Sequence, residues 1–342
     1  MGIVLAILIF GFIVFFHELG HFFLARRNGI DVDEFWIGMG PTLLHKKIGN
    51  TDYCLKLFPI GGACMMGEDE VDDLTPGSFN SKSPWRRISV IAAGPVFNFI
   101  LAFLCAFVFI SILGVDKPVL SAVSEGGPAA EAGLKAGDRI VRINDKSIRI
   151  FRDITIYNQF HQGEEYEVTY ERDGKQETVL VTPEPDETGY YLMGVTSSGY
   201  EKGNILENIG YAAYEVKYWV DVTIKSLGQL VTGKIGMDQL SGPVGVVDAV
   251  DTTYKASKSG GALVVFINML RMTILLSANL GVMNLLPIPA LDGGRLVFLF
   301  LELIRGKRVP PEKEGYVHLA GMAVLLCLMV FVLFNDIKRI IM

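Results

Sequence analysis

Residues His17-Glu18-Leu19-Gly20-His21 (HELGH) stand within the first long apolar segment of the chain. The residues that precede this motif, 2–16, include no charged side chain. Ionisable groups at membrane depth are costly, so their presence calls for a functional explanation. One helical turn separates His17 from His21, so both imidazoles lie on one face and can bind a single metal ion, with Glu18 beside them. The stretch therefore predicts a membrane-spanning helix that carries part of a metal site.

A single histidine in an apolar helix is usually a core residue whose ring bonds to a carbonyl. Two histidines at metal-binding spacing, among only five in 342 residues, favour a metal site instead. A catalytic zinc ion is normally held by three protein ligands and keeps one position for water. The sequence is therefore expected to supply a third ligand elsewhere.

The composition argues against several classes of protein. The chain is 50% hydrophobic and carries a formal net charge of −6, which speaks against nucleic acid as a main partner. Its four cysteines form no CxxC pair, so neither a disulfide framework nor a cysteine metal site is expected. With five histidines, the chain also lacks the ligands that a membrane di-iron enzyme needs.

Four segments approach the roughly 20 apolar residues that cross the hydrocarbon of a bilayer. They are residues 2–25, 88–114, 272–291 and 316–334. The first is followed, not preceded, by positive charge, so it is expected to remain as a span and not to be removed as a signal peptide. Lysines and arginines gather in residues 26–87 and between the third and fourth segments, which predicts that both connections are cytoplasmic. The two termini and the long middle region are then expected outside the cytoplasm.

The first connection contains a predicted β-hairpin. Two strand-like runs, 43–48 and 52–58, are separated by Gly49-Asn50, and the pattern is expected to break at Pro59-Ile60-Gly61-Gly62. An edge strand near an intramembrane site can bind an unwound substrate by strand addition. A structural hairpin that covers the cytosolic mouth of the site is an equally good interpretation.

The middle region is predicted to hold a small α+β domain. Residues 126–144 combine a short helix, a turn and an alternating strand, and further strand patterns follow at 166–170 and 177–181. This run resembles a bacterial PDZ domain, a fold that can take a peptide as an added strand. We expect the following organisation: a membrane part at 1–115, the PDZ-like domain at 116–200, an amphipathic helix and linker at 201–261, and a second membrane part at 262–342.

Three side chains near the third and fourth segments are candidates for the third metal ligand, namely Asp292, Glu302 and His318. Asp292 lies in the stretch 284–294 (NLLPIPALDGG), where two prolines remove helix donors and two glycines permit unusual backbone conformations. A helix that breaks at membrane depth is tolerated where it lines a cavity or is buried in protein. A carboxylate placed at such a break makes Asp292 the strongest candidate.

HELGH at 17–21 and NLLPIPALDGG at 284–294 resemble the site-2 protease family of zinc intramembrane proteases, of the bacterial regulator of sigma-E protease type. The similarity extends to Ala93-Gly94-Pro95-Val96-Phe97-Asn98-Phe99 in the second span and to the inserted PDZ-like domain, so it covers nearly the whole chain.

The resemblance implies a zinc-dependent endopeptidase. His17, His21 and Asp292 would hold Zn²⁺, and Glu18 would act as the base that takes a proton from the attacking water. Asn284 resembles the family asparagine that holds the substrate backbone or stabilises the oxyanion, although an interhelical hydrogen bond is a serious rival role. The implied substrates are single-span membrane proteins, such as anti-sigma factors or remnant signal peptides, cut in regulated intramembrane proteolysis.

The expected fold is a polytopic α-helical membrane protein of about four transmembrane helices, with a cytosolic membrane-associated β-hairpin and an inserted extracytoplasmic PDZ-like α+β domain. The resemblance places it in the bacterial cell membrane, with the lipid bilayer and the substrates as partners. Two other classes remain as alternatives: a metal or ion transporter, for which no internal repeat is visible, and a non-catalytic PDZ membrane scaffold.

Overall fold

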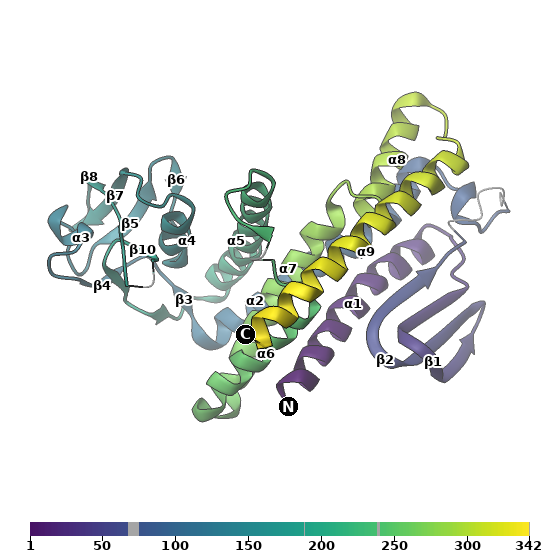
Figure 1. Cartoon of the computed structure of the whole chain (residues 1–342), viewed down its shortest axis with the longest axis horizontal. Coiled ribbons are helices and arrows are strands. Elements are labelled where there is room, and N and C mark those ends of the chain that lie inside the picture. Colours follow the sequence, from purple (N-terminus) through teal and green to yellow (C-terminus); the bar gives the residue numbers. More distant parts are fainter. Residues whose placement is uncertain (68–74, 188, 238–239, 342) are drawn as a thin grey trace. The chain divides into compact units, whose positions relative to one another are not determined.

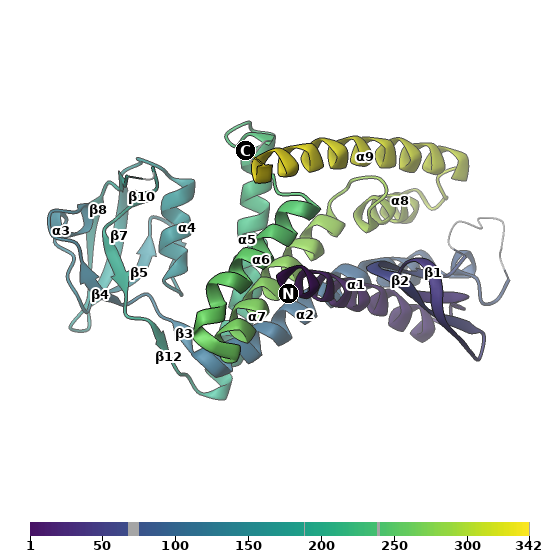
Figure 2. The same ribbon diagram turned by 60° about the horizontal axis from the view of Figure 1, so that its bottom comes forward.

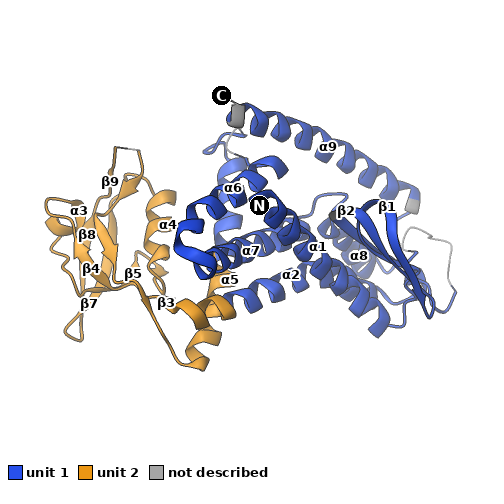
Figure 3. Ribbon diagram, turned by 90° about the horizontal axis from the view of Figure 1, so that it is seen from below, with its two compact units in different colours: residues 1–106, 219–342 blue, residues 107–218 orange. Residues whose placement is uncertain are grey.

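The computed structural model describes residues 1–67, 75–187, 189–237 and 240–341, which form two compact units. Unit 1 comprises Met1–Ala106 and Trp219–Met342, and unit 2 comprises Phe107–Tyr218 (Figure 3). The chain enters unit 2 along one helix, α2, and leaves it along another, α5 (Figure 1).

Within the described residues, four helical segments are long and apolar enough to cross a membrane: Gly2–Arg27, Pro84–Leu113, Pro243–Leu285 and Glu312–Arg339. The first and second are α1 (Gly2–Arg27) and α2 (Pro84–Leu113), the fourth lies in α9 (Pro311–Ile341), and the third contains α6 (Pro243–Ser257) and α7 (Gly261–Leu285). The coarse expectation of a multi-pass membrane protein is therefore confirmed.

The third span differs from its prediction. The sequence predicted a helix over 272–291, beginning after Arg271, but α7 already begins at Gly261 and ends at Leu285. Arg271 lies inside the helix because one charged side chain does not interrupt the backbone hydrogen bonds. The helix ends early because Pro287 and Pro289 can donate no backbone hydrogen bond. After a short loop, a separate helix, α8 (Asp292–Arg305), begins (Figure 2).

The helix α6 packs against α1 and α7. Ala6, Val250 and Met269 form a small buried core among the three helices. The first turn of α6 contains Pro243, whose missing N–H costs nothing at a helix start. At this helix start the backbone N–H groups of Gly242 and Gly245 have no acceptor within the helix. They donate instead to the buried carboxylate of Asp336 on α9, at 3.2 and 2.7 Å.

The predicted β-hairpin is present but longer than expected. Its strands are β1 (Glu34–Ile48) and β2 (Thr51–Met65), joined at Gly49-Asn50. The expectation that the pattern breaks at 59–62 is wrong, since β2 continues to Met65. Glycines with positive φ, at Gly38, Gly40 and Gly61, let the long strands bend instead of ending there.

The bends fold the two strands into a small sheet in which the start of β1 is paired on both sides. Phe35, for example, pairs with Tyr53 and also with Cys64. The pairing therefore orders the segments as 44–48, 51–55, 34–37 and 62–65. The last segment, 62–65, is an edge strand, which we call the β2 edge.

The β2 edge lies against α1 at the HELGH motif. A Cβ atom added at Gly62 would stand 3.1 Å from Cγ of Glu18 and 3.4 Å from a methyl of Val14. A hydrophobic core that contains Phe35, Cys64 and Val90 holds the sheet on α1, α2 and α8. The hairpin is thus packed beside the motif and is not a free surface loop.

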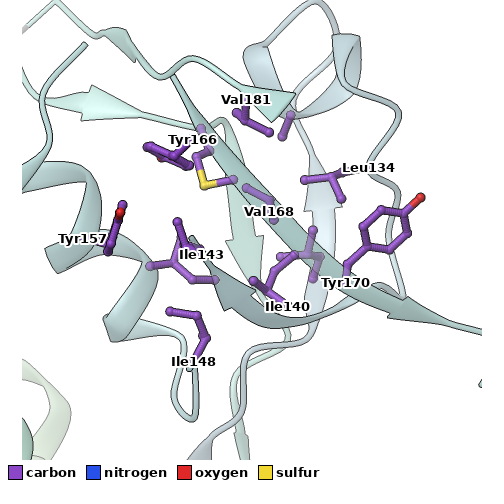
Figure 4. Close-up of a cluster of buried hydrophobic side chains, with 13 residues drawn as sticks. Leu134, Ile140, Ile143, Ile148, Tyr157, Tyr166, Val168, Tyr170 and Val181 are labelled. Carbon is purple, nitrogen blue, oxygen red and sulfur yellow. The ribbon is translucent and has the colours of Figure 1, made fainter. Parts of the chain in front are cut away.

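Unit 2 contains a four-stranded antiparallel sheet in the order β6-β5-β7-β8. Its strands are β5 (Arg139–Ile143), β6 (Lys146–Ser147), β7 (Tyr166–Arg172) and β8 (Lys175–Val181), and the helices α3 (Pro128–Glu131) and α4 (Arg152–Phe160) belong to the same unit. Alternate side chains of β7, namely Tyr166, Val168 and Tyr170, point into one buried cluster (Figure 4).

Short strand pairs complete unit 2: β3 (Val115–Asp116) with β12 (Tyr200–Glu201), β4 (Leu120–Val123) with β11 (Val195–Ser197), and β9 (Glu184–Pro185) with β10 (Tyr191–Leu192). The first pair brings the two ends of the predicted PDZ-like domain together, because Asp116 pairs with Tyr200. The helix α5 (Ile205–Val231) follows.

Candidate metal centre

Three side chains from distant parts of unit 1 converge at one point. His17 and His21 lie one turn apart on α1 and are 8% and 6% exposed. Asp292 is the first residue of α8, directly after Leu291, whose backbone is extended. A carboxylate is favoured in the first turn of a helix because the free N–H groups there carry partial positive charge. The break between α7 and α8 therefore presents Asp292 to α1.

The three facing atoms form a nearly regular triangle. Nε2 of His17 and Nε2 of His21 are 3.2 Å apart, and they lie 3.1 and 3.5 Å from Oδ2 of Asp292. Zinc bonds to nitrogen and oxygen ligands are about 2.0–2.1 Å long, so the edges of its tetrahedron measure about 3.3 Å. The triangle matches one face of such a tetrahedron.

The burial of a carboxylate oxygen in the triangle also indicates that a cation binds there. Oδ2 of Asp292 is buried and accepts no hydrogen bond of ordinary geometry among the described residues. A buried carboxylate oxygen without a partner is strongly disfavoured unless a positive charge is near. His17, His21 and Asp292 are also the only group of three or more His, Cys, Asp and Glu side chains in the described part of the chain that could hold one ion.

The carboxylate of Glu18 lies beside this triangle on α1 and is half-buried. The backbone N–H of Cys64, in the β2 edge, donates to it. Gly62 of the same edge leaves the space that the side chain of Glu18 occupies. The hairpin thus holds the carboxylate of Glu18 in place.

The second apolar helix contributes contacts that the sequence analysis missed. Nδ1 of His21 donates to the carbonyl of Val90 at 2.9 Å, and the side-chain amide of Asn98 lies 3.2 Å from Nδ1 of His17. A Cβ atom at Gly94 would stand only 2.3 Å from Nε2 of His21 and 2.7 Å from Cε1 of His17. The signal that could have identified this face of α2 is Asn98, a polar side chain in a span that has no charged residue from 88 to 114.

The other two candidate ligands face elsewhere. Glu302 pairs with the buried Arg87 at 2.5 Å. Nδ1 of His318 accepts the N–H of Ala290 at 2.9 Å, so the ring supports the loop that leads to Asp292. Asn284 is half-buried in the last turn of α7, and among the described residues its side chain makes no hydrogen bond.

A cavity of about 710 Å³ in unit 1 reaches the metal centre. Asp292 lines it together with apolar side chains of α8 and α9, including Phe298, Leu299, Leu319 and Met322. Figure 2 shows α8 next to the first half of α9. The carboxylate is therefore reached from a partly apolar space between two helices.

Comparison with known proteins identifies the family. The model of "Peptidase family M50" matches residues 5–328. The chain belongs to peptidase family M50. The predicted resemblance to the site-2 proteases and the predicted peptidase activity are thereby confirmed.

Two proteins of bacilli are similar to this chain over almost its whole length. The chain is 37% identical to zinc metalloprotease RasP of Bacillus licheniformis, over 98% of this chain and 98% of that protein. It is 36% identical to the regulator of sigma-W protease RasP of Bacillus subtilis, over 98% and 97% respectively. The PDZ domain of the SdrC-like protein Lmo2051 of Listeria monocytogenes is 23% identical over 25% of this chain and 92% of that domain, with a TM-score of 0.22.

We predict that Gly94→Ala weakens metal binding in this M50 peptidase by roughly tenfold or more, the scale of a disturbed ligand environment. The added methyl would meet both imidazoles, so the rings must leave the triangle. Zinc per chain, measured by elemental analysis after competition with a chelator, checks this. Gly210→Ala is the matched control, because a Cβ there meets nothing within 4 Å. Equal zinc retention by both variants would contradict the geometry described.

Proposed function

We propose that this chain is an intramembrane zinc endopeptidase that hydrolyses peptide bonds in single-span membrane proteins. The convergence of His17 and His21, from the apolar helix α1, with Asp292, the first residue of α8, is the observation that carries the proposal. Relatives named as zinc metalloproteases support zinc as the metal. In this proposal the three side chains are the protein ligands of Zn²⁺, and they leave one position for water.

Bound Zn²⁺ supplies two things, a water molecule of lowered pKa and polarisation of the scissile carbonyl. Glu18 takes the proton of the attacking water and passes it to the leaving nitrogen. The N–H of Cys64 donates to the carboxylate of Glu18 and restrains it beside the proposed zinc ligands. Asn284 is proposed to donate to the substrate backbone or to the developing oxyanion, a contact that in other enzymes contributes a few kcal/mol.

Two features suit an unwound substrate. The β2 edge lies beside Glu18 and pairs with residues 34–37 on one side, and an edge strand is a place where an extended substrate can be added as a further strand. The cavity at Asp292 provides a partly apolar space for side chains of the same segment. The carbonyls of a transmembrane helix are already bonded, so the substrate must unwind locally before the cut.

The charge pattern supports an orientation in the cell membrane. Lysines and arginines gather in residues 26–87 and 305–313, which supports a cytoplasmic location of the hairpin and of the α8–α9 connection. Both termini and the PDZ-like domain at 116–200 are then outside the cytoplasm. Since the relative from Bacillus subtilis is named a regulator of sigma-W, we infer that anti-sigma factors are a substrate class.

The two alternative classes have less support. Neither a metal transporter nor a non-catalytic PDZ scaffold needs a proton acceptor, so neither function explains a carboxylate at Glu18. Membership of a peptidase family, together with a carboxylate held beside three candidate ligands, favours hydrolysis.

Glu18→Gln is expected to stop cleavage while zinc stays bound. The amide cannot accept the proton of the attacking water, so the rate of substrate cleavage should fall by about 10²–10⁴-fold. Cleavage of a reconstituted single-span protein and zinc content are measured together. Glu125→Gln, at an exposed position of unit 2, should cut at the parent rate. Continued cleavage by the Glu18 variant would rule out this base.

Substrate unwinding is tested with a pair of single-span substrates that differ only beside the cleaved bond. One carries two glycines there, and the other carries two alanines, which stabilise the helix by about 2 kcal/mol in total. The alanine substrate is expected to be cut roughly 30-fold more slowly, because its bond is exposed less often. The same exchange made two turns away is the control. Equal rates for the pair would exclude local unwinding as a requirement.

The PDZ-like domain is proposed to exclude substrates that still carry a bulky extracytoplasmic domain. Because Asp116 pairs with Tyr200, residues 117–199 can be replaced by an Asn-Gly turn without separating the ends. This deletion variant is expected to cut an untrimmed substrate that the full chain spares. The same deletion combined with Glu18→Gln shows whether the cut comes from this site. Selectivity that stays unchanged would remove the filter role.

A further inference from the structure

We propose that α2 sets the ring orientation and tautomer of both zinc-binding histidines, with Asn98 as the positioning residue for His17. The inference rests on the proposed zinc site and goes beyond it, because it assigns a task to a helix that supplies no ligand. It concerns Val90, Gly94 and Asn98, which are spaced four residues apart and therefore share one face of α2.

This face lies in close contact with α1. A Cβ at Gly20 would stand 2.4 Å from the carbonyl oxygen of Ala93, so the two backbones approach without a side chain between them. Gly94 leaves the space in which both imidazoles sit. Glycines at the contact thus allow the face of α2 to reach the Nδ1 atoms of the two rings.

The contact to His21 is made by the backbone. Its Nδ1–H donates to the carbonyl oxygen of Val90. In a neutral imidazole only one nitrogen carries a hydrogen, so this bond leaves Nε2 as the free lone pair. Nε2 is the atom that faces Asp292 and His17. The bond therefore selects the metal-binding tautomer of His21.

The contact to His17 is made by the side chain of Asn98, which is 0% exposed. When Nε2 of His17 binds a metal, its Nδ1 must carry the hydrogen and needs an acceptor. Oδ1 of Asn98 is buried and has no hydrogen-bond partner among the described residues, while the amide nitrogen lies 3.2 Å from Nδ1. A half-turn of the amide brings Oδ1 onto Nδ1–H and gives the buried oxygen its partner.

The backbone of Asn98 is contacted by a second helix. The hydroxyl of Ser277, a fully buried residue of α7, donates to the carbonyl of Asn98 at 2.8 Å. The helix α7 leads directly into the break that presents Asp292. Asn98 thus joins the ligand helix α1 to the helix that precedes the third ligand, and Ser277 offers a control that touches the same residue without touching the ring.

The test measures metal binding, not hydrolysis. Asn98→Leu keeps the branched shape of the side chain and removes the acceptor, and Asn98→Asp keeps an acceptor. Ser277→Ala removes only a hydrogen bond to the backbone carbonyl of Asn98, and the helical hydrogen bonds of α2 keep that backbone in place. Zn²⁺ affinity is measured by competition with a chromophoric chelator on the detergent-purified full chain. The visible absorption of the Co²⁺-substituted protein reports the ligand geometry, which a change in packing alone would leave intact.

The leucine variant is expected to bind Zn²⁺ about 10–100-fold more weakly, the usual effect of losing such a partner, and to show altered Co²⁺ bands. The aspartate variant should return to within a few-fold of the parent, and Ser277→Ala should match the parent in both measurements. A leucine variant with parent affinity and parent spectrum would overturn the proposal, as would an aspartate variant as weak as the leucine one.

Three further outcomes are distinguishable. If Asn98→Leu does not yield folded protein, Asn98→Ala takes its place and the comparison with Asn98→Asp decides in the same way. If the parent chain itself binds neither Zn²⁺ nor Co²⁺, the proposed zinc site fails. If the parent binds both and the acceptor makes no difference, only the role of Asn98 fails.

Discussion

The structure of unit 1 depends on one electrostatic constraint, a carboxylate oxygen buried against two imidazoles inside apolar helices. Oδ2 of Asp292 lies 3.1 and 3.5 Å from the two Nε2 atoms and has no hydrogen-bond donor of ordinary geometry among the described residues. Such a group is costly to bury unless a cation completes it. A zinc ion held by the three atoms would remove this cost, and it would explain why side chains 275 and 271 residues apart in the chain meet at one point.

The backbone around Asp292 is folded tightly to satisfy this constraint. A Cβ at Gly293 would meet the carbonyl oxygen of Leu286 at 2.0 Å, and one at Gly294 would meet that of Ile288 at 2.5 Å. Ala290 adopts a φ of 76°, which is unfavourable for a residue with a side chain. Its N–H donates to His318 of α9. The two glycines and the histidine thus hold a loop that would not keep this shape alone.

Three elements around α1 each contact a different group of the site. The break between α7 and α8 brings the third ligand, the face of α2 contacts the outer nitrogens of both rings, and the β2 edge contacts the carboxylate of Glu18. Hydrolysis needs a proton acceptor whose position relative to the metal is fixed, and a backbone N–H provides this more rigidly than a mobile side chain. The hairpin is therefore part of the catalytic environment in the proposed function, beyond any role as a cover.

The sequence by itself determined what depends on local rules. Apolar length indicated the membrane helices, the i and i+4 spacing indicated a metal-binding face at His17 and His21, and Gly49-Asn50 indicated the hairpin turn. The proline-rich stretch before Asp292 indicated a broken helix. The structure brings these three candidate ligands together, while the role of Asn284 stays a prediction.

Only the tertiary structure decided what depends on contacts between distant segments. The continuation of β2 to Met65 follows from pairing with the far side of β1, which no local pattern records. The contacts of Val90 and Asn98 with the rings arise because glycines let α1 and α2 approach closely. Periodicity shows which residues share a face of a helix, but packing determines which other helix that face meets.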